Sequence, residues 1–128
     1  MSNYQQLALR AEKMNINSDH QGAIKLLEPY ANEEENNNMS FFNELGIAYG
    51  KRGVQLQNIS LWRKAYNCHK KSYLLDSNEP MYMFNLAMAA TWLENYEEAK
   101  ELFKKYIESG HRKERNLAKD LLVKLERR

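Results

Sequence analysis

The sequence is poor in the residues that break helices. Only five glycines and two prolines occur among 128 residues. Because a fold of many short strands needs many turns, this scarcity favours long helices over a β fold. Hydrophobic residues make up 43% of the chain, which is enough for a core, and the length fits one modest domain. We therefore expect a single all-α domain.

Cysteines and long hydrophobic runs are also scarce. Cys68 is the one cysteine, so no disulfide can form within the chain, which is typical of a reducing compartment. Residues 1–21 contain no apolar run of the kind found in a signal peptide. No stretch approaches the ~18 apolar residues that span a bilayer. We expect a soluble, cytoplasmic protein that does not associate with membranes.

Charge of one sign is scarce overall, since the formal net charge is only +2. Residues 112–128 hold seven Lys/Arg and three Asp/Glu, or +4, so the other residues sum to −2. We interpret this basic tail as the solvated face of a helix. Aromatic residues do not alternate with its basic residues, so nucleic acid is not an expected partner.

Patterns that carry chemistry are missing as well. The sequence contains no glycine-rich phosphate loop, no nucleophile elbow and no metal-ligand spacing. Cys68 and His69 are adjacent, so on a helix they point ~100° apart and cannot easily share a ligand. We interpret His69 as a buried neutral core residue. The sequence predicts no enzyme, no metal and no cofactor.

A repeat of about 34 residues is present instead. Ala65 and Ala99 are 34 residues apart, and Ala11 and Gly46 are 35 apart. Ala87 and Ala99 are 12 residues apart, whereas Gly46 and Ala65 are 19 apart. The difference of seven predicts an insertion in the middle repeat near residues 54–60, either as longer helices or as a loop. Such self-similarity is typical of a helical repeat protein.

Each repeat reads as two amphipathic helices joined by a turn. The predicted boundaries are repeat one at 4–31, repeat two at 39–76, repeat three at 80–110 and a capping helix at 112–128. In the capping helix, Leu117, Leu121 and Leu125 form an apolar stripe that would close the last repeat. Ser18 and Asn95, each followed three residues later by Gln or Glu, predict capping boxes.

These residues resemble the tetratricopeptide repeat. Phe42, Leu45, Gly46 and Tyr49 match the first half of its pattern in repeat two. Ala99, preceded by Glu and followed four residues later by Phe, matches the second half in repeat three. The resemblance implies an all-α, right-handed superhelix of three helical hairpins plus the capping helix. It also implies a protein–protein interaction module, such as an adaptor, co-chaperone or regulatory scaffold, with a concave groove lined by the first helix of each pair.

The first helix of repeat three carries two apolar rows, and the second row is a candidate groove surface. Since a helix that is apolar nearly all round must be covered on both sides, we expect this row to be exposed until a partner covers it. By the geometry of the family, residues of repeats one and two complete the site. The predicted groove residues are Met81, Phe84, Asn85, Met88, Trp92, Asn43, Ile47, Lys51 and Glu12.

Other occupants of this row are conceivable. The capping helix or the inserted segment could fold over it, or a second copy of the chain could bind it in a homodimer. Some relatives in the family use the groove to clamp a C-terminal carboxylate with basic side chains. Here the corresponding positions include Ala8, Glu12 and Met81, so we do not expect that clamp.

Overall fold

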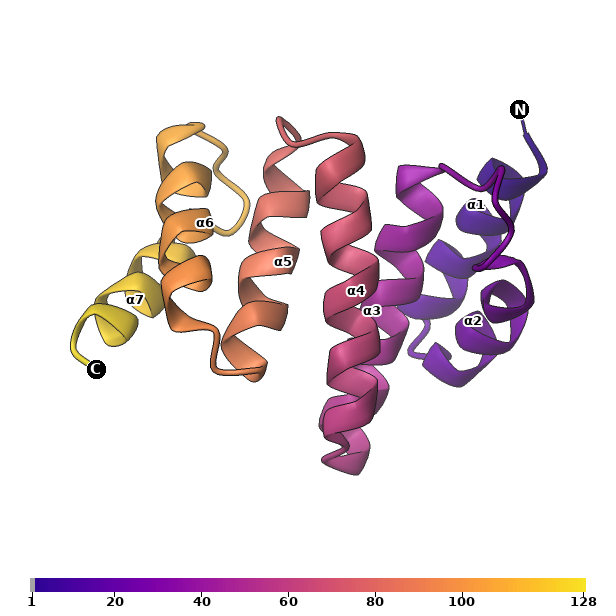
Figure 1. The fold of residues 1–128 in the computed structure, drawn as a ribbon, viewed down its shortest axis with the longest axis horizontal. Helices are drawn as coiled ribbons and strands as arrows, with labels where there is room; N and C mark the ends of the chain where they lie inside the picture. Colours follow the sequence, from indigo (N-terminus) through magenta and orange to yellow (C-terminus); the bar gives the residue numbers. More distant parts are fainter. Residues whose placement is uncertain (1) are drawn as a thin grey trace.

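The chain folds as a row of seven α-helices, with no strand in residues 2–128, the part that this computed structural model describes (Figure 1). The all-α fold expected from the sequence is confirmed. The helices are α1 (Asn3–Ile16), α2 (His20–Leu27), α3 (Met39–Leu56), α4 (Ile59–Leu75), α5 (Pro80–Trp92), α6 (Tyr96–Glu108) and α7 (Arg115–Glu126), and a 3-10 helix η1 (Glu28–Tyr30) follows α2.

Side-chain caps set the start of the central helices. The Asn38 side chain accepts a hydrogen bond of 2.8 Å from the backbone N–H of Phe41, and Asn58 accepts one of 3.2 Å from Leu61. Each bond satisfies an N–H that has no partner within the first turn. Pro80 is the first residue of α5, where its missing N–H does no harm.

The predicted capping boxes are wrong in detail. Ser18 has a left-handed backbone, with a φ of 64°, and the next residue, Asp19, caps α2 by accepting from Gly22. Asn95 precedes α6, but its side chain makes no capping bond. The final helix also begins later than expected, at Arg115, after a turn over the preceding residues.

The helices form three hairpins, α1 with α2, α3 with α4 and α5 with α6, and each hairpin packs against the next (Figure 1). The small residues of the repeat lie where the helices touch. Gly46, Ala65, Ala87 and Ala99 are all buried. Small side chains at these positions let neighbouring helices approach closely, so the repeat spacing builds the helical superhelix.

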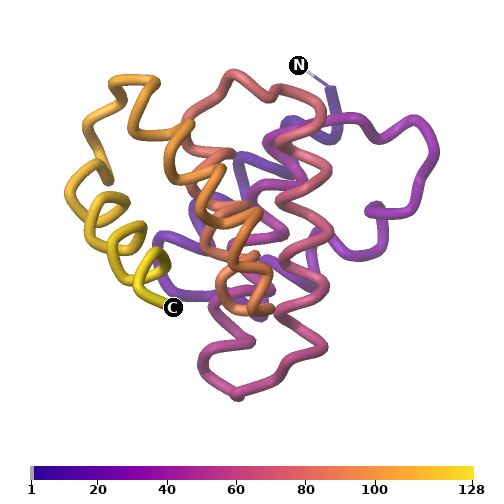
Figure 2. The backbone as a smooth tube through the Cα atoms, turned by 60° about the vertical axis from the view of Figure 1, so that its left-hand side comes forward, coloured from indigo at the N-terminus to yellow at the C-terminus, as the bar shows by residue number. Residues whose placement is uncertain are grey.

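The core has two parts. One lies among α1 to α4 around Leu27, Phe41 and Leu45, and the other lies among α5 to α7 around Phe103 and Tyr106. Ala118 and Leu125 of α7 belong to the second part. The last helix therefore covers the open end of the third hairpin, as Figure 2 shows for the yellow segment.

The seven extra residues of the middle repeat lengthen its helices. Helices α3 and α4 have 18 and 17 residues, whereas α5 and α6 have 13 each. The chain turns between them at Gln57, which has a φ of 50°, and at Asn58. Figures 1 and 2 both show this hairpin projecting beyond its neighbours.

Candidate functional site

The first helices of the hairpins line a groove. A hollow of about 420 Å³ lies between α3 and α5, and we call it the apolar hollow. A smaller hollow of about 250 Å³ is lined by α1, α3 and the start of α5, and we call it the polar hollow. The side-chain amide of Asn85 in the first donates a hydrogen bond of 2.9 Å to Asn43 in the second. The two hollows therefore adjoin and form one groove.

The structure brings eight of the nine predicted groove residues to these two hollows. Those in the apolar hollow are Ile47, Lys51, Phe84, Asn85, Met88 and Trp92, and those in the polar hollow are Glu12 and Asn43. Their helical spacing explains this grouping, because residues four apart share one face of a helix. Met81 is half-buried and packs against the C-terminal part of the core.

The expected exposed row is largely covered. Phe84 is only 7% exposed, and its ring lies 5.8 Å from that of Phe103 and 5.4 Å from that of Tyr106. The expectation of an exposed Phe84 was wrong because α5 is apolar nearly all round, so its sequence does not mark which row faces the core. Phe84 is a core residue that also forms part of the floor of the groove.

Trp92 is also held by the fold. Its indole is stacked on that of Trp62, with 6.5 Å between ring centroids and 26° between planes. The edge of the ring occupies the space beside Gly50, where a Cβ would come within 2.8 Å of it. Trp92 therefore forms a wall of the apolar hollow. Met88, half-buried on the same helix, is the more adaptable side chain.

The asparagine pair lies where the two hollows meet. The bond from Asn85 to Asn43 uses one donor and one acceptor. Within residues 2–128, no side-chain bond involves the amide nitrogen of Asn43 or the carbonyl oxygen of Asn85. Both groups are suited to hydrogen-bonding the backbone of a bound segment.

The polar hollow is acidic. Glu44 is buried, and Asn15 donates hydrogen bonds of 3.1 Å to both its backbone and its side-chain oxygen. Burial raises the pKa of Glu44, the Asn15 hydrogen bond opposes this, and the nearby Glu12 carboxylate adds to it. Two carboxylates at this end would repel an acidic ligand and attract a basic one.

His69 lies at the apolar hollow, a position that the sequence analysis did not assign to the groove. The residue is 3% exposed, as expected of a core histidine, and the Nδ1 of its ring has no hydrogen-bond partner among the described residues. Burial lowers the pKa of His69 to about 4, although a hydrogen bond with the Gly46 backbone opposes this. The ring is therefore neutral near pH 7.

The extended hairpin and the last helix also contribute to the groove. Val54 and Gln55 come from the lengthened end of α3, while Glu114 and Leu117 come from the start of α7. Neither contribution was predicted, because the spacing of the repeats does not say whether an insertion or a final helix bends toward the groove. The final helix both caps the core and borders one end of the apolar hollow.

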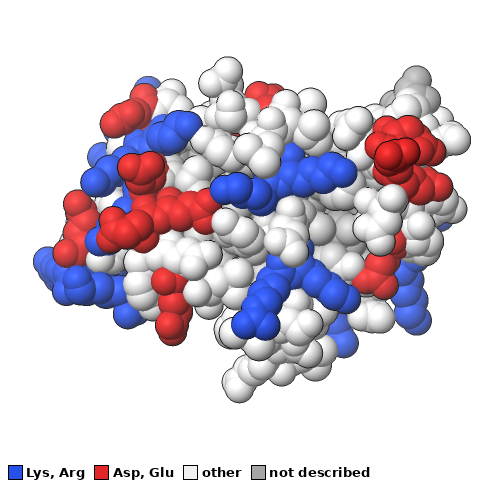
Figure 3. All heavy atoms as spheres, viewed as in Figure 1, with Lys and Arg blue, Asp and Glu red and all other residues white. Residues whose placement is uncertain are grey.

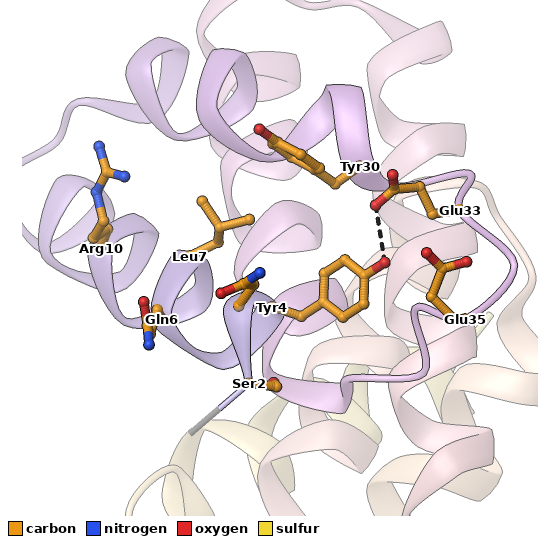
Figure 4. Close-up of a pocket in the computed structure, with 9 residues that line it drawn as sticks. Ser2, Tyr4, Gln6, Leu7, Arg10, Tyr30, Glu33 and Glu35 are labelled. Atoms are coloured by element: carbon orange, nitrogen blue, oxygen red, sulfur yellow. Dashed lines mark hydrogen bonds between the residues drawn. The ribbon is translucent and has the colours of Figure 1, made fainter.

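A separate hollow of about 560 Å³ lies at the N-terminal end of the molecule (Figure 4). Tyr4, Tyr30 and Glu33 line it, and the Tyr4 hydroxyl donates a hydrogen bond of 2.9 Å to Glu33. None of the predicted groove residues borders it. In the described part of the chain, no group of three or more His, Cys, Asp and Glu residues could hold a metal ion.

No protein-family model matches the sequence, and no curated protein is significantly similar to it. Two solved structures resemble the fold. The crystal structure of PcrH from Pseudomonas aeruginosa has a TM-score of 0.73 and 18% sequence identity, and the match covers 98% of this chain and 95% of that chain. The chain shares the fold of PcrH. This is a tetratricopeptide-like helical repeat fold.

A second structure shows PcrH in complex with the chaperone binding region of PopB. It has a TM-score of 0.65 and 17% identity, with coverage of 98% of this chain and 95% of that chain. At this identity the likeness to PcrH establishes the arrangement of the helices. The role of the groove in this chain has to be argued from its own residues.

Proposed function

We propose that this chain is a non-catalytic interaction module of the tetratricopeptide family, which binds a peptide or helix of a partner protein in its groove. The observation that carries the proposal is the grouping of Ile47, Asn85, Met88 and their neighbours around one hollow between α3 and α5. PcrH, which has the same fold, forms a complex with a segment of another protein. A chaperone or adaptor role in the cytoplasm, where a lone cysteine stays reduced, fits this proposal.

The groove also indicates which segment it would bind. Apolar side chains would enter the hollow beside Ile47 and Met88, because burial of apolar surface stabilises a complex. The backbone of the segment would meet Asn43 and Asn85. A lysine or arginine would lie toward Glu12, since the polar hollow is acidic.

A peptide-display selection against the whole chain tests this proposal. We expect the selected peptides to combine apolar residues with a basic residue, and we expect Met88→Glu to weaken their binding at least about 100-fold, because it places a charge in an apolar hollow. Leu74→Glu is the matched control, since Leu74 is 68% exposed on α4 and borders neither hollow. Peptides that bind the Met88→Glu variant as tightly as the original chain would refute the groove as the site.

Self-association through the same apolar row is the alternative function. The burial of Phe84 and the half-burial of Met81, Met88 and Trp92 reduce the apolar area that a flat dimer contact could use. This observation favours the groove for an inserted segment. Light scattering distinguishes the two functions, because a dimer would dissociate on dilution and would be disrupted by Met88→Glu.

A further inference from the structure

The α3–α4 hairpin has an unusual charge pattern. Between Glu44 and Asp76 the chain contains no acidic residue, but it contains six lysines and arginines. The other residues, apart from the basic tail, must therefore carry −8, given a net charge of +2 and a tail of +4. The hairpin that carries the insertion is thus a concentrated source of positive charge, independent of the tail.

The projecting end of this hairpin is apolar. Val54, Leu56 and Ile59 flank the turn at Gln57, and they are 53%, 54% and 50% exposed. Their neighbours Gln55, Asn58 and Ser60 are exposed and uncharged. We call residues 54–60 the tip. An apolar group at the outermost point of a molecule is covered by nothing in the fold and marks a contact surface.

Four basic residues form a collar behind the tip. Lys51 and Arg52 lie on α3, and Arg63 and Lys64 lie on α4. All four are four or five residues from Leu56 or Ile59, which places their backbones about 6–8 Å behind the tip along the helices. Their side chains are long enough to reach the level of the tip. Figure 3 shows blue side chains just above the white end of this hairpin.

The collar is not neutralised within the molecule. The ion pairs found in residues 2–128 are Lys70 with Glu98 and Lys100 with Glu97, and neither includes a collar residue. The Arg52 guanidinium donates to the Gln55 side chain, which leaves its charge intact. Lys64 lies over the ring of Tyr49 at 5.5 Å, a contact that also keeps its charge. An anionic surface would complement all four.

We propose that the tip docks onto the surface of an anionic lipid membrane. Val54, Leu56 and Ile59 would enter the boundary between headgroups and acyl chains, and the collar would bind the lipid phosphates. The shape favours a membrane over a protein, because a narrow apolar projection needs a deep matching pocket in a protein but enters a soft lipid interface directly. This surface lies at one end of the molecule and acts independently of what the groove binds.

The docking would be peripheral. No helix in residues 2–128 combines the length and the apolar content required to cross a membrane. The proposal departs from the expectation, drawn from composition, that the protein avoids membranes. Composition cannot show that a short insertion places three apolar side chains at an exposed turn with cations on both sides.

Co-sedimentation of the whole chain with vesicles tests the proposal. The vesicles would contain phosphatidylcholine alone, or phosphatidylcholine and phosphatidylserine at about two to one. We expect binding to the anionic vesicles that weakens with added salt, and little binding to the neutral ones. The triple variant Val54→Ser, Leu56→Ser and Ile59→Ser should bind at least about tenfold more weakly, because each side chain loses its apolar contact with lipid.

Two further variants make the test specific. Arg63→Gln with Lys64→Gln should also weaken binding about tenfold or more, since each cation near such a surface contributes to it. Leu74→Ser with Leu75→Ser, at the opposite end of α4, should leave binding unchanged. All of these residues are exposed or half-exposed, so circular dichroism should show an intact fold.

Three results would overturn the proposal. The chain could fail to bind the anionic vesicles, or bind the neutral ones equally well. The tip variant could also sediment as the original chain does, which would assign the contact to the basic face of α7. If vesicle binding is absent and light scattering shows a dimer that the tip variant abolishes, the tip contacts a second copy and not a membrane.

Discussion

Replacing Gly46 with alanine tests how the groove and the core are joined. A Cβ built on Gly46 would lie 2.7–2.9 Å from three atoms of the His69 ring. Real Cβ atoms do not approach so closely, and His69 is almost wholly buried, so its ring cannot swing into solvent. The ring would have to move toward the apolar hollow that it borders.

Two opposing effects set the size of the change. Alanine in place of glycine within a helix stabilises it by roughly 1 kcal/mol. Overpacking a tight core costs ~1–3 kcal/mol. Because the ring has so little freedom, we expect the second effect to win. The variant should lose about 1 kcal/mol of its free energy of unfolding, which lowers Tm by roughly 4 °C for a domain of this size.

Chemical denaturation of a double-mutant cycle isolates the contact. Gly46→Ala should destabilise the original chain but not the His69→Ala variant, where the added methyl group meets no ring. Gly53→Ala on the same helix is the matched control. Its Cβ meets the ring of Trp62, which is half-exposed and can move aside, so we expect a smaller loss. A stable Gly46→Ala variant, or additive effects in the cycle, would refute the reasoning.

Three other outcomes follow from the same packing. The folded pKa of His69, about 4, lies below the value near 6.5 of an unfolded chain, so the unfolded state binds the proton first; stability should fall by up to about 3 kcal/mol between pH 6.5 and 4, and denaturation of His69→Gln should show a shallower decline, with a residual slope from His20, whose pKa is lowered by burial and by Lys51. Phe103→Ala should cost about 4 kcal/mol in urea unfolding, whereas Val123→Ala, at an exposed position, should cost under about 0.5; similar losses in both would contradict the assigned core. Burial raises the pKa of the Cys68 thiol to about 12, so a thiol reagent at pH 8 should label it rapidly only in denaturant, and fast labelling of the folded chain would show that this packing is wrong.

The sequence alone determined the kind of fold. Residues 12 and 34 apart recur with small side chains, as at Ala87 and Ala99, and this period survives whatever the turns do because it reflects contacts between neighbouring helices. The same reasoning located most of the groove. Once α3 and α5 are known to be first helices, residues such as Ile47 and Met88 lie on one face by helical geometry.

Only the tertiary structure decided which side of an apolar helix is covered and where an insertion goes. Phe84 faces two aromatic rings of α6, an outcome that no pattern within α5 encodes, since its apolar residues surround the helix. The seven extra residues lengthen two helices and project a tip, and His69 borders the groove because Gly46 leaves room for its ring. Periodicity reports the direction of a side chain around its own helix, whereas burial depends on which other helix occupies that direction.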